Sequence, residues 1–145
     1  MKLFYVLNLL LQVKKLYVGQ NGILSTPAVS CIIRKKAASG GFILSASHNP
    51  GGPNGDFGIK FNTANGGPAP TDVTERIFKL TETIGEYRIC QDLECDVSKV
   101  GVNNYVVDSS DFEVEVIDSM KVTEVDNNQN ILTYELLNDE KKIYL

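Results

Sequence analysis

The chain has 145 residues, of which 43% are hydrophobic and 22% are charged, and its formal net charge is −4. A chain of this length forms about one domain and can bury a core. The composition is ordinary for a globular protein. The negative net charge argues against a nucleic-acid-binding protein, which usually presents a basic patch. It decides nothing about small anionic ligands, because a few local lysines or arginines govern their binding.

The first twelve residues, MKLFYVLNLLLQ, combine one lysine with an apolar run. The run has no small-residue cleavage site, and Asn8 interrupts it, which argues against a cleaved signal peptide. It is also too short to span a bilayer. We therefore expect no membrane partner, and we interpret the run as a core helix or as foreign sequence from an alternative start.

The three cysteines, Cys31, Cys90 and Cys95, are odd in number and have no C-x-x-C spacing. A zinc site is not expected, because the sequence contains one histidine and few thiolate ligands. We interpret the cysteines as reduced thiols of a cytoplasmic protein.

The first predicted elements are a strand and a helix. An apolar run at residues 16–18, ended by Gly19-Gln20-Asn21-Gly22, predicts a strand that stops at a turn. Ser25 then supplies a helix cap, and Pro27 is tolerated in the first helical turn. Apolar residues recur at helical spacing as far as the basic residues 34–36, which suit the negative end of the helix dipole.

Further strands and one amphipathic helix follow. Residues 42–44 predict a buried strand, so strand, helix and strand predict parallel pairing through a right-handed crossover. Residues 57–61 and 112–116 alternate between apolar and polar side chains, as half-exposed strands do. Residues 71–86 predict a helix with Thr71 as its cap. The apolar stripe of that helix consists of Val73, Ile77, Leu80 and Ile84. These elements indicate the α/β class.

Residues 45–52, Ser-Ala-Ser-His-Asn-Pro-Gly-Gly, directly follow a predicted strand. In open α/β sheets, ligands bind outside the carboxyl ends of strands, where this loop should lie. Its glycines allow close approach of a ligand, and inward-pointing N–H groups could bind an anion. A serine there could act as a nucleophile if a base activates it. All of these residues are also common in solvated turns, so composition alone leaves both interpretations open.

Three linked motifs narrow the choice. They are Gly-Gln-Asn-Gly-Ile-Leu-Ser-Thr-Pro-Ala-Val at residues 19–29, the loop at 45–52, and Asp-Phe-Gly-Ile-Lys-Phe-Asn at 56–62, which Asn-Gly-Gly-Pro-Ala-Pro follows at 65–70. In this order, they resemble the phosphoglucomutase branch of the α-D-phosphohexomutases over roughly residues 16–119. The resemblance implies an incomplete α/β/α layered domain with a mixed sheet, like the first domain of that family.

The resemblance also implies the site residues and the reaction. Ser47 matches the serine that carries a phosphoryl group, and its phosphate would be a ligand of Mg²⁺. His48 matches the histidine that supports substrate binding and proton handling, and Lys60 matches a lysine with an acid–base or charge-stabilising role. The implied reaction interconverts glucose 1-phosphate and glucose 6-phosphate, with glucose 1,6-bisphosphate as intermediate and activator. Two alternatives remain: His48 only braces the turn, and Lys60 is an outward lysine on an edge strand.

Several family features have no counterpart in the sequence. We find no Asp-Gly-Asp-Gly-Asp metal loop, no Gly-Glu-Glu-Ser sugar-reading loop and no distal phosphate-binding loop. We therefore predict a divergent segment at 1–15, a partial first domain at 16–119 and a divergent polar tail at 120–145. We expect a cytoplasmic monomer that binds hexose phosphates but does not catalyse the reaction as this chain alone. The alternative is a non-catalytic fragment or pseudoenzyme that acts as an interaction module.

Overall fold

The computed structural model describes residues 13–86, 94–107, 110–119, 121–125 and 131–133. The predictions for the N-terminal run, for Cys90 and for most of the polar tail therefore lie outside the described residues. The elements, in chain order, are β1 (Lys15–Gly19), the 3-10 helix η1 (Gln20–Gly22), α2 (Thr26–Lys35), β2 (Gly40–Ser45), β3 (Gly58–Thr63), α3 (Thr71–Thr81), β4 (Gly101–Val107), β5 (Ser110–Ile117), β6 (Thr123–Val125) and β7 (Ile131–Thr133).

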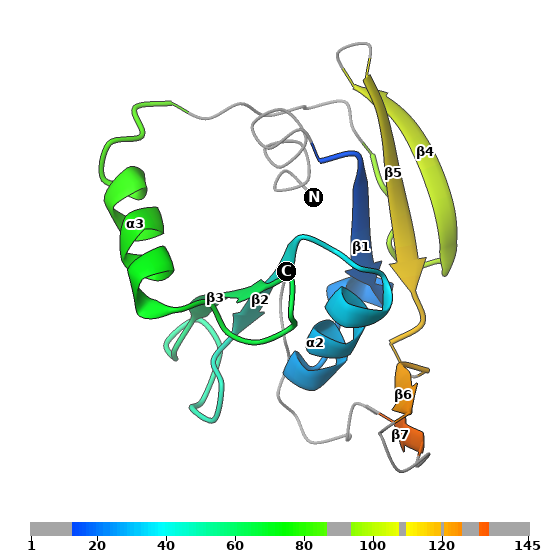
Figure 1. Ribbon diagram of the computed structural model, residues 1–145, viewed down its shortest axis with the longest axis horizontal. Helices are drawn as coiled ribbons and strands as arrows, with labels where there is room; N and C mark the ends of the chain where they lie inside the picture. Colours follow the sequence, from blue (N-terminus) through cyan, green and yellow to red (C-terminus); the bar gives the residue numbers. More distant parts are fainter. Residues whose placement is uncertain (1–12, 87–93, 108–109, 120, 126–130, 134–145) are drawn as a thin grey trace.

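A mixed sheet of three strands in the order β1–β5–β4 contains the main core (Figure 1). β1 runs parallel to β5, and β4 runs antiparallel to β5. Phe112, Val114 and Val116 of β5 are buried and pack with Val18 and Cys95. The intervening glutamates lie on the other face of the sheet, as their alternation predicts. The α/β class with a mixed sheet is thus confirmed.

Helix α2 begins where its sequence predicts. The hydroxyl of Ser25 accepts a hydrogen bond from the backbone N–H of Ala28 at 3.3 Å, and Pro27 lies in the first turn. The buried face of α2 packs against Tyr17 of β1 on one side. On the other side, a Cβ added at Gly41 of β2 would lie 3.0 Å from a side-chain carbon of Ile33. The helix thus contacts both strands that flank it in the sequence.

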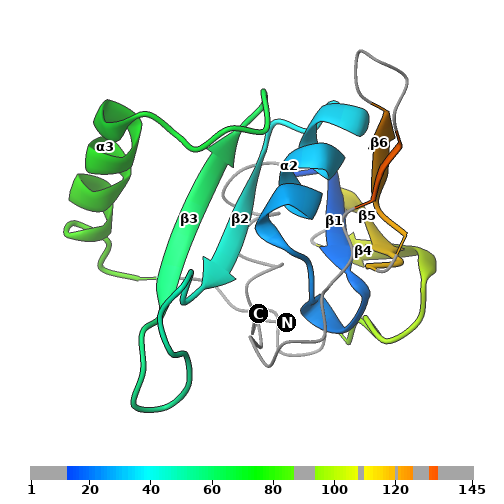
Figure 2. The same ribbon diagram turned by 90° about the horizontal axis from the view of Figure 1, so that it is seen from below.

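The predicted parallel crossover is wrong, because β2 does not pair with β1. In the described part of the chain, β2 pairs antiparallel with β3 and forms a separate two-stranded ribbon. An antiparallel pair needs only the loop that joins its strands, and neighbours in the chain pair readily. Figure 2 shows α2 between this ribbon and the mixed sheet.

Strand β2 is only partly buried, contrary to the prediction for residues 42–44. Ile43 is buried, whereas Phe42 is 40% exposed. Alternation places Gly41 and Ile43 on the face that α2 covers and Phe42 on the opposite face. There the Phe42 ring lies 5.2 Å from the ring of Phe61, between centroids. One helix covers one face, so the other face meets solvent.

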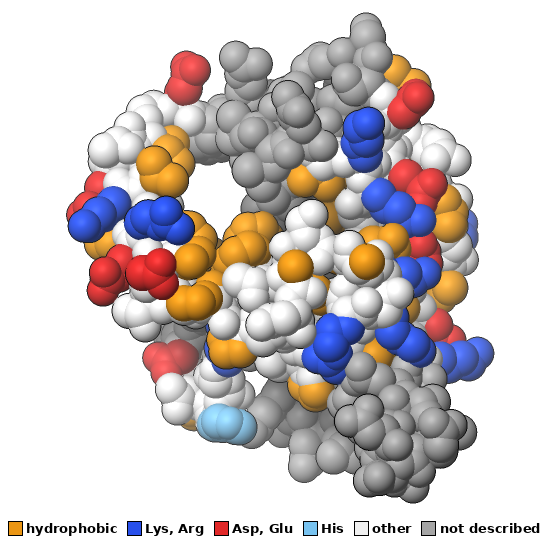
Figure 3. Space-filling model, viewed as in Figure 1, with side chains coloured by type: hydrophobic (Ala, Val, Ile, Leu, Met, Phe, Trp, Pro, Cys, Tyr) orange, Lys and Arg blue, Asp and Glu red, His pale blue; other side chains and the backbone are white. Residues whose placement is uncertain are grey.

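Helix α3 lies beside β3, at the end of the molecule away from the mixed sheet (Figures 1 and 2). It ends at Thr81, before the predicted end, and Pro70 rather than Thr71 is its N-cap, with no side-chain capping bond. None of its residues is buried, and Leu80 is 64% exposed. Hydrophobic side chains gather on α3 and on the adjoining ribbon in Figure 3. The helix is amphipathic as predicted, but no described element covers its apolar stripe.

No helix within the described ranges is both long and apolar enough to cross a bilayer.

Candidate functional site

The serine-containing loop joins β2 to β3 and begins where β2 ends (Figure 2). Ser45 and Gly58 pair at its base, so the ribbon sets the distance between the two ends of the loop. The loop is exposed throughout residues 47–57. The predicted position at the carboxyl end of a strand is therefore confirmed, and the loop is open to solutes.

Ser47 has an unusual backbone conformation. Its φ is 58°, in the left-handed region that residues other than glycine seldom adopt. Its backbone N–H donates to the hydroxyl oxygen of Ser45 at 2.9 Å. The N–H of Asn49 donates to the carbonyl oxygen of Ala46 at 3.1 Å and closes the turn. Such a conformation persists only when its surroundings fix it, and it is frequent at functional sites.

The second half of the loop is linked to the first by Asp56. The side-chain amide of Asn49 donates to a carboxylate oxygen of Asp56 at 2.5 Å. The backbone N–H of Asp56 donates to the carbonyl oxygen of Pro50 at 2.9 Å. Gly55 fits closely inside, because an added Cβ would lie 2.3 Å from that same carbonyl oxygen. Sequence reasoning did not single out Asp56 as a site residue.

The side chains of Ser47 and His48 are both exposed. The imidazole is the pale blue group on the surface in Figure 3. Among the described residues, the bonds that hold the turn come from Ser45, Asn49 and Asp56 and not from the imidazole. The geometry therefore leaves His48 available for a solute.

Lys60 lies on β3, opposite Ile43 of β2, and is exposed. Directly paired residues share a face, and so do alternate residues along a strand. Lys60 therefore shares a face with Ser45, whose hydroxyl holds the N–H of Ser47. The register brings the lysine toward the base of the loop, although an outward lysine on this strand remains the alternative. The roles of Ser47, His48 and Lys60 stay predictions.

The described residues do not form a magnesium site by themselves. They contain no group of three or more His, Cys, Asp or Glu side chains that could hold a metal ion. In the loop, Asp56 is the only carboxylate, and it accepts the bond from Asn49. Any Mg²⁺ bound to a phosphate on Ser47 would lack a protein ligand set among these residues.

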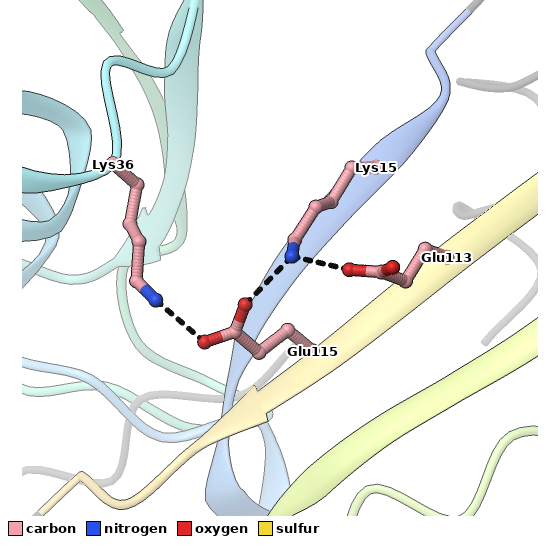
Figure 4. Close-up of polar contacts among 4 residues, drawn as sticks. All are labelled: Lys15, Lys36, Glu113 and Glu115. Carbon is pink, nitrogen blue, oxygen red and sulfur yellow. Dashed lines mark hydrogen bonds and ion pairs between the residues drawn. The ribbon is translucent and has the colours of Figure 1, made fainter.

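A network of ion pairs lies away from the loop, between α2 and the mixed sheet (Figure 4). Lys15 contacts both Glu113 and Glu115, and Lys36 lies 2.7 Å from the other oxygen of Glu115. Hydrogen bonds from Lys15 and then Lys36 hold the pKa of Glu115 below its usual value. Glu113 and then Glu115 raise the pKa of Lys15. Lys36 is therefore engaged in structure, as is typical of a helix end rather than a phosphate clamp.

A cavity of about 330 Å³ adjoins this network. It is lined by α2, β4, the end of β5 and the segment that follows β5, and includes Lys36, Val102, Glu115 and Lys121. Its charged groups already form pairs, since Lys36 contacts Glu115 and Lys121 contacts Asp118 at 3.2 Å. No pattern in the sequence indicated this cavity, and these charged side chains are engaged in ion pairs.

Comparisons with known proteins agree with this arrangement. The family model for phosphoglucomutase/phosphomannomutase alpha/beta/alpha domain I matches residues 7–88. The chain is 59% identical over 109 residues to phosphoglucomutase-1 of Oryctolagus cuniculus, and 54% identical over 110 residues to phosphoglucomutase-like protein 5 of Homo sapiens. Each match covers 74% of this chain and 19% of the relative. The chain thus spans about a fifth of the length of these relatives.

A solved structure resembles the chain as well. The crystal structure of the Paramecium exocytosis-sensitive phosphoprotein parafusin, described as a phosphoglucomutase in its open form, superposes with a TM-score of 0.66 at 43% identity. The match covers 74% of this chain and 21% of the Paramecium chain.

Proposed function

Because this chain belongs to the phosphoglucomutase/phosphomannomutase family, as part of its α/β/α domain I, we propose that its Ser47 loop is a phosphoryl-carrying loop for hexose phosphates. The single observation that carries the proposal is the conformation of Ser47. Neighbouring hydrogen bonds hold it in a left-handed turn, exposed at the end of β2. Such a backbone is disfavoured for serine, and backbones of this kind are frequent at functional sites.

The chemistry transfers a phosphoryl group between two oxygen atoms. The bond between phosphorus and the Ser47 oxygen breaks, a bond from phosphorus to the 6-hydroxyl oxygen of glucose 1-phosphate forms, and the proton of that hydroxyl ends on the Ser47 oxygen. Glucose 1,6-bisphosphate then reorients, the bond between its other phosphorus and the sugar 1-oxygen breaks, and that phosphoryl group returns to the Ser47 oxygen. The Ser47 hydroxyl proton passes to the sugar 1-oxygen, and glucose 6-phosphate leaves. The serine begins and ends phosphorylated, so the net reaction is an isomerisation.

The groups around Ser47 suit this transfer. Phosphoryl transfer depends mainly on positioning and on neutralising the charge of the moving group. A phosphoserine adds about −1.5 to −2 charges, and the lysine on the neighbouring strand brings a positive charge to the same end of the ribbon. The exposed His48 supplies a group that can exchange protons with a substrate hydroxyl. Mg²⁺ remains an expectation for the family.

The test is intact-mass spectrometry of the chain after incubation with glucose 1,6-bisphosphate and Mg²⁺. We expect one phosphate adduct on the wild type, none on Ser47→Ala and an unchanged adduct on Ser98→Ala, a serine outside the loop. A folded wild type without an adduct, or an adduct that survives Ser47→Ala, would overturn the proposal.

A second candidate is a non-catalytic interaction module. The uncovered apolar stripe of α3, with Leu80 64% exposed, favours it. Turnover of glucose 1-phosphate by the pure chain would exclude this candidate. A cytoplasmic location and a monomeric state remain part of the first proposal.

A further inference from the structure

We propose that Asp56 is a positioning residue that holds the reactive turn, through Asn49, in the conformation that presents Ser47. The inference rests on the proposed function of the loop, because it assigns a role within the same site. Asp56 would fix the backbone conformation of the loop before a sugar phosphate binds.

Asp56 forms hydrogen bonds to two successive residues of the turn, Asn49 and Pro50. Its carboxylate accepts the side-chain amide of Asn49 at 2.5 Å, and its backbone N–H donates to the carbonyl oxygen of Pro50 at 2.9 Å. An isolated parallel β-bridge also pairs the backbone of Gly51 with that of Asp56. A hydrogen bond to an ionised carboxylate is stronger than one between neutral groups. The two halves of an exposed loop are thereby joined without any apolar packing.

The left-handed Ser47 lies between two such restraints. On its N-terminal side, the hydroxyl of Ser45 accepts its backbone N–H. On its C-terminal side, Asn49 closes the turn through its own N–H and is held by Asp56 through its side chain. Since the φ of 58° is disfavoured for serine, loss of either restraint would let the turn relax toward an ordinary conformation. Asp56 acts on Ser47 through Asn49 and does not touch it.

A positioning role differs from a role for the negative charge itself. Asp56→Asn keeps an oxygen that can accept the amide of Asn49, but it removes the charge. Asp56→Ala removes both. We therefore expect Asp56→Asn to retain part of the restraint, since a neutral acceptor makes a weaker bond, and Asp56→Ala to lose it. If the charge acted directly as a base or as a metal ligand, the two variants would be equally impaired.

The first readout does not depend on activity. Amide hydrogen exchange of the full chain, measured residue by residue by NMR, reports on the N–H groups of Asn49, Gly55 and Asp56, which are bonded inside the loop. Loss of the link should speed their exchange about fivefold in Asp56→Ala and in Asn49→Ala, the effect of about one hydrogen bond. The double variant should match the singles because both remove the same bond. The amides of β5 serve as the control and should not change.

The second readout is the rate of phosphate uptake at Ser47 from glucose 1,6-bisphosphate. It should fall about fivefold in Asp56→Ala and less in Asp56→Asn, which keeps an acceptor for the amide of Asn49. Unchanged loop exchange in Asp56→Ala, or equal impairment of both variants, would overturn the inference. If the wild type takes up no phosphate, the proposed function fails, whereas the exchange data still decide whether Asp56 holds the turn.

Discussion

The mixed sheet buries one face of β5, whereas the β2–β3 ribbon leaves large apolar side chains in solvent. Val114 is fully buried, while Ile59 of the ribbon is 67% exposed. Side-chain packing therefore fixes the sheet, and local hydrogen bonds fix the loop at the end of the ribbon. Regions with few buried apolar contacts open at low free-energy cost, and binding loops are commonly drawn from them. We therefore expect the candidate site to lie in the less stable of the two regions.

The largest expected effect is on stability and should separate the two regions clearly. Phe112→Ala in the sheet should lower the free energy of unfolding by about 3–5 kcal/mol, because it empties a fully packed site. Phe78→Ala on α3 is the matched control and should change it by no more than about 0.5 kcal/mol, because that ring is 63% exposed. Urea unfolding followed by circular dichroism measures both. Equal losses would mean that the ring of Phe78 is covered in solution.

Gly55→Ala should produce the opposite pattern. The added Cβ would lie 2.3 Å from the carbonyl oxygen of Pro50, so the loop must shift. We expect phosphate uptake at Ser47 to fall at least about tenfold, the equivalent of about 1.4 kcal/mol. Stability should change little, because the loop buries nothing. Gly52→Ala gives a comparison, since an added Cβ there meets no atom within 4 Å, although its φ of 118° still favours glycine. Equal uptake by Gly55→Ala and the wild type would contradict the loop geometry.

The smallest expected effect is the pH dependence of the sheet. The pKa of Glu115 is lowered in the folded state, so its ion pairs stabilise the fold above the ordinary carboxyl pKa and are lost as pH falls through the lowered pKa. The pKa of Lys15 is raised, so its contribution persists until strongly alkaline pH. Glu115→Gln should cost about 1 kcal/mol at neutral pH and flatten the acid limb of a stability–pH curve.

Lys99→Gln is the control for that curve. Lys99 pairs with Asp96 at 3.3 Å, but its side chain is 84% exposed, so its loss should be hardly measurable. An acid limb that Glu115→Gln leaves unchanged would show that other carboxylates govern the acid sensitivity.

The sequence predicted the elements whose determinants are local. The cap at Ser25 and the alternation at 112–116 each depend on neighbouring residues, and both are confirmed. The pairing of β2 was predicted wrongly, because strand pairing depends on which strands the fold brings next to one another. β1 pairs with β5, a strand almost one hundred residues later in the chain. The stripe of α3 was visible in the sequence, but its exposure was not, since a pattern does not say what covers it.

The site divides in the same way. The loop and its place after a strand followed from the motif, and the sequence singled out Ser47, His48 and Lys60. The left-handed φ of Ser47 and the bond between Asn49 and Asp56 did not follow, because they depend on how two halves of a loop meet. Asp56 could have been suspected as the only carboxylate near the serine, but nothing in the spacing showed that it would reach back to Asn49.

The most direct test of the central claim is to locate the phosphate in the sequence. After incubation of the full chain with glucose 1,6-bisphosphate and Mg²⁺, peptide fragmentation by mass spectrometry assigns any phosphate to one residue. The account predicts phosphate on Ser47 and none on Ser45, whose hydroxyl accepts the bond from the N–H of Ser47. Phosphate on Ser45, or no phosphate on a chain shown to be folded, would contradict it.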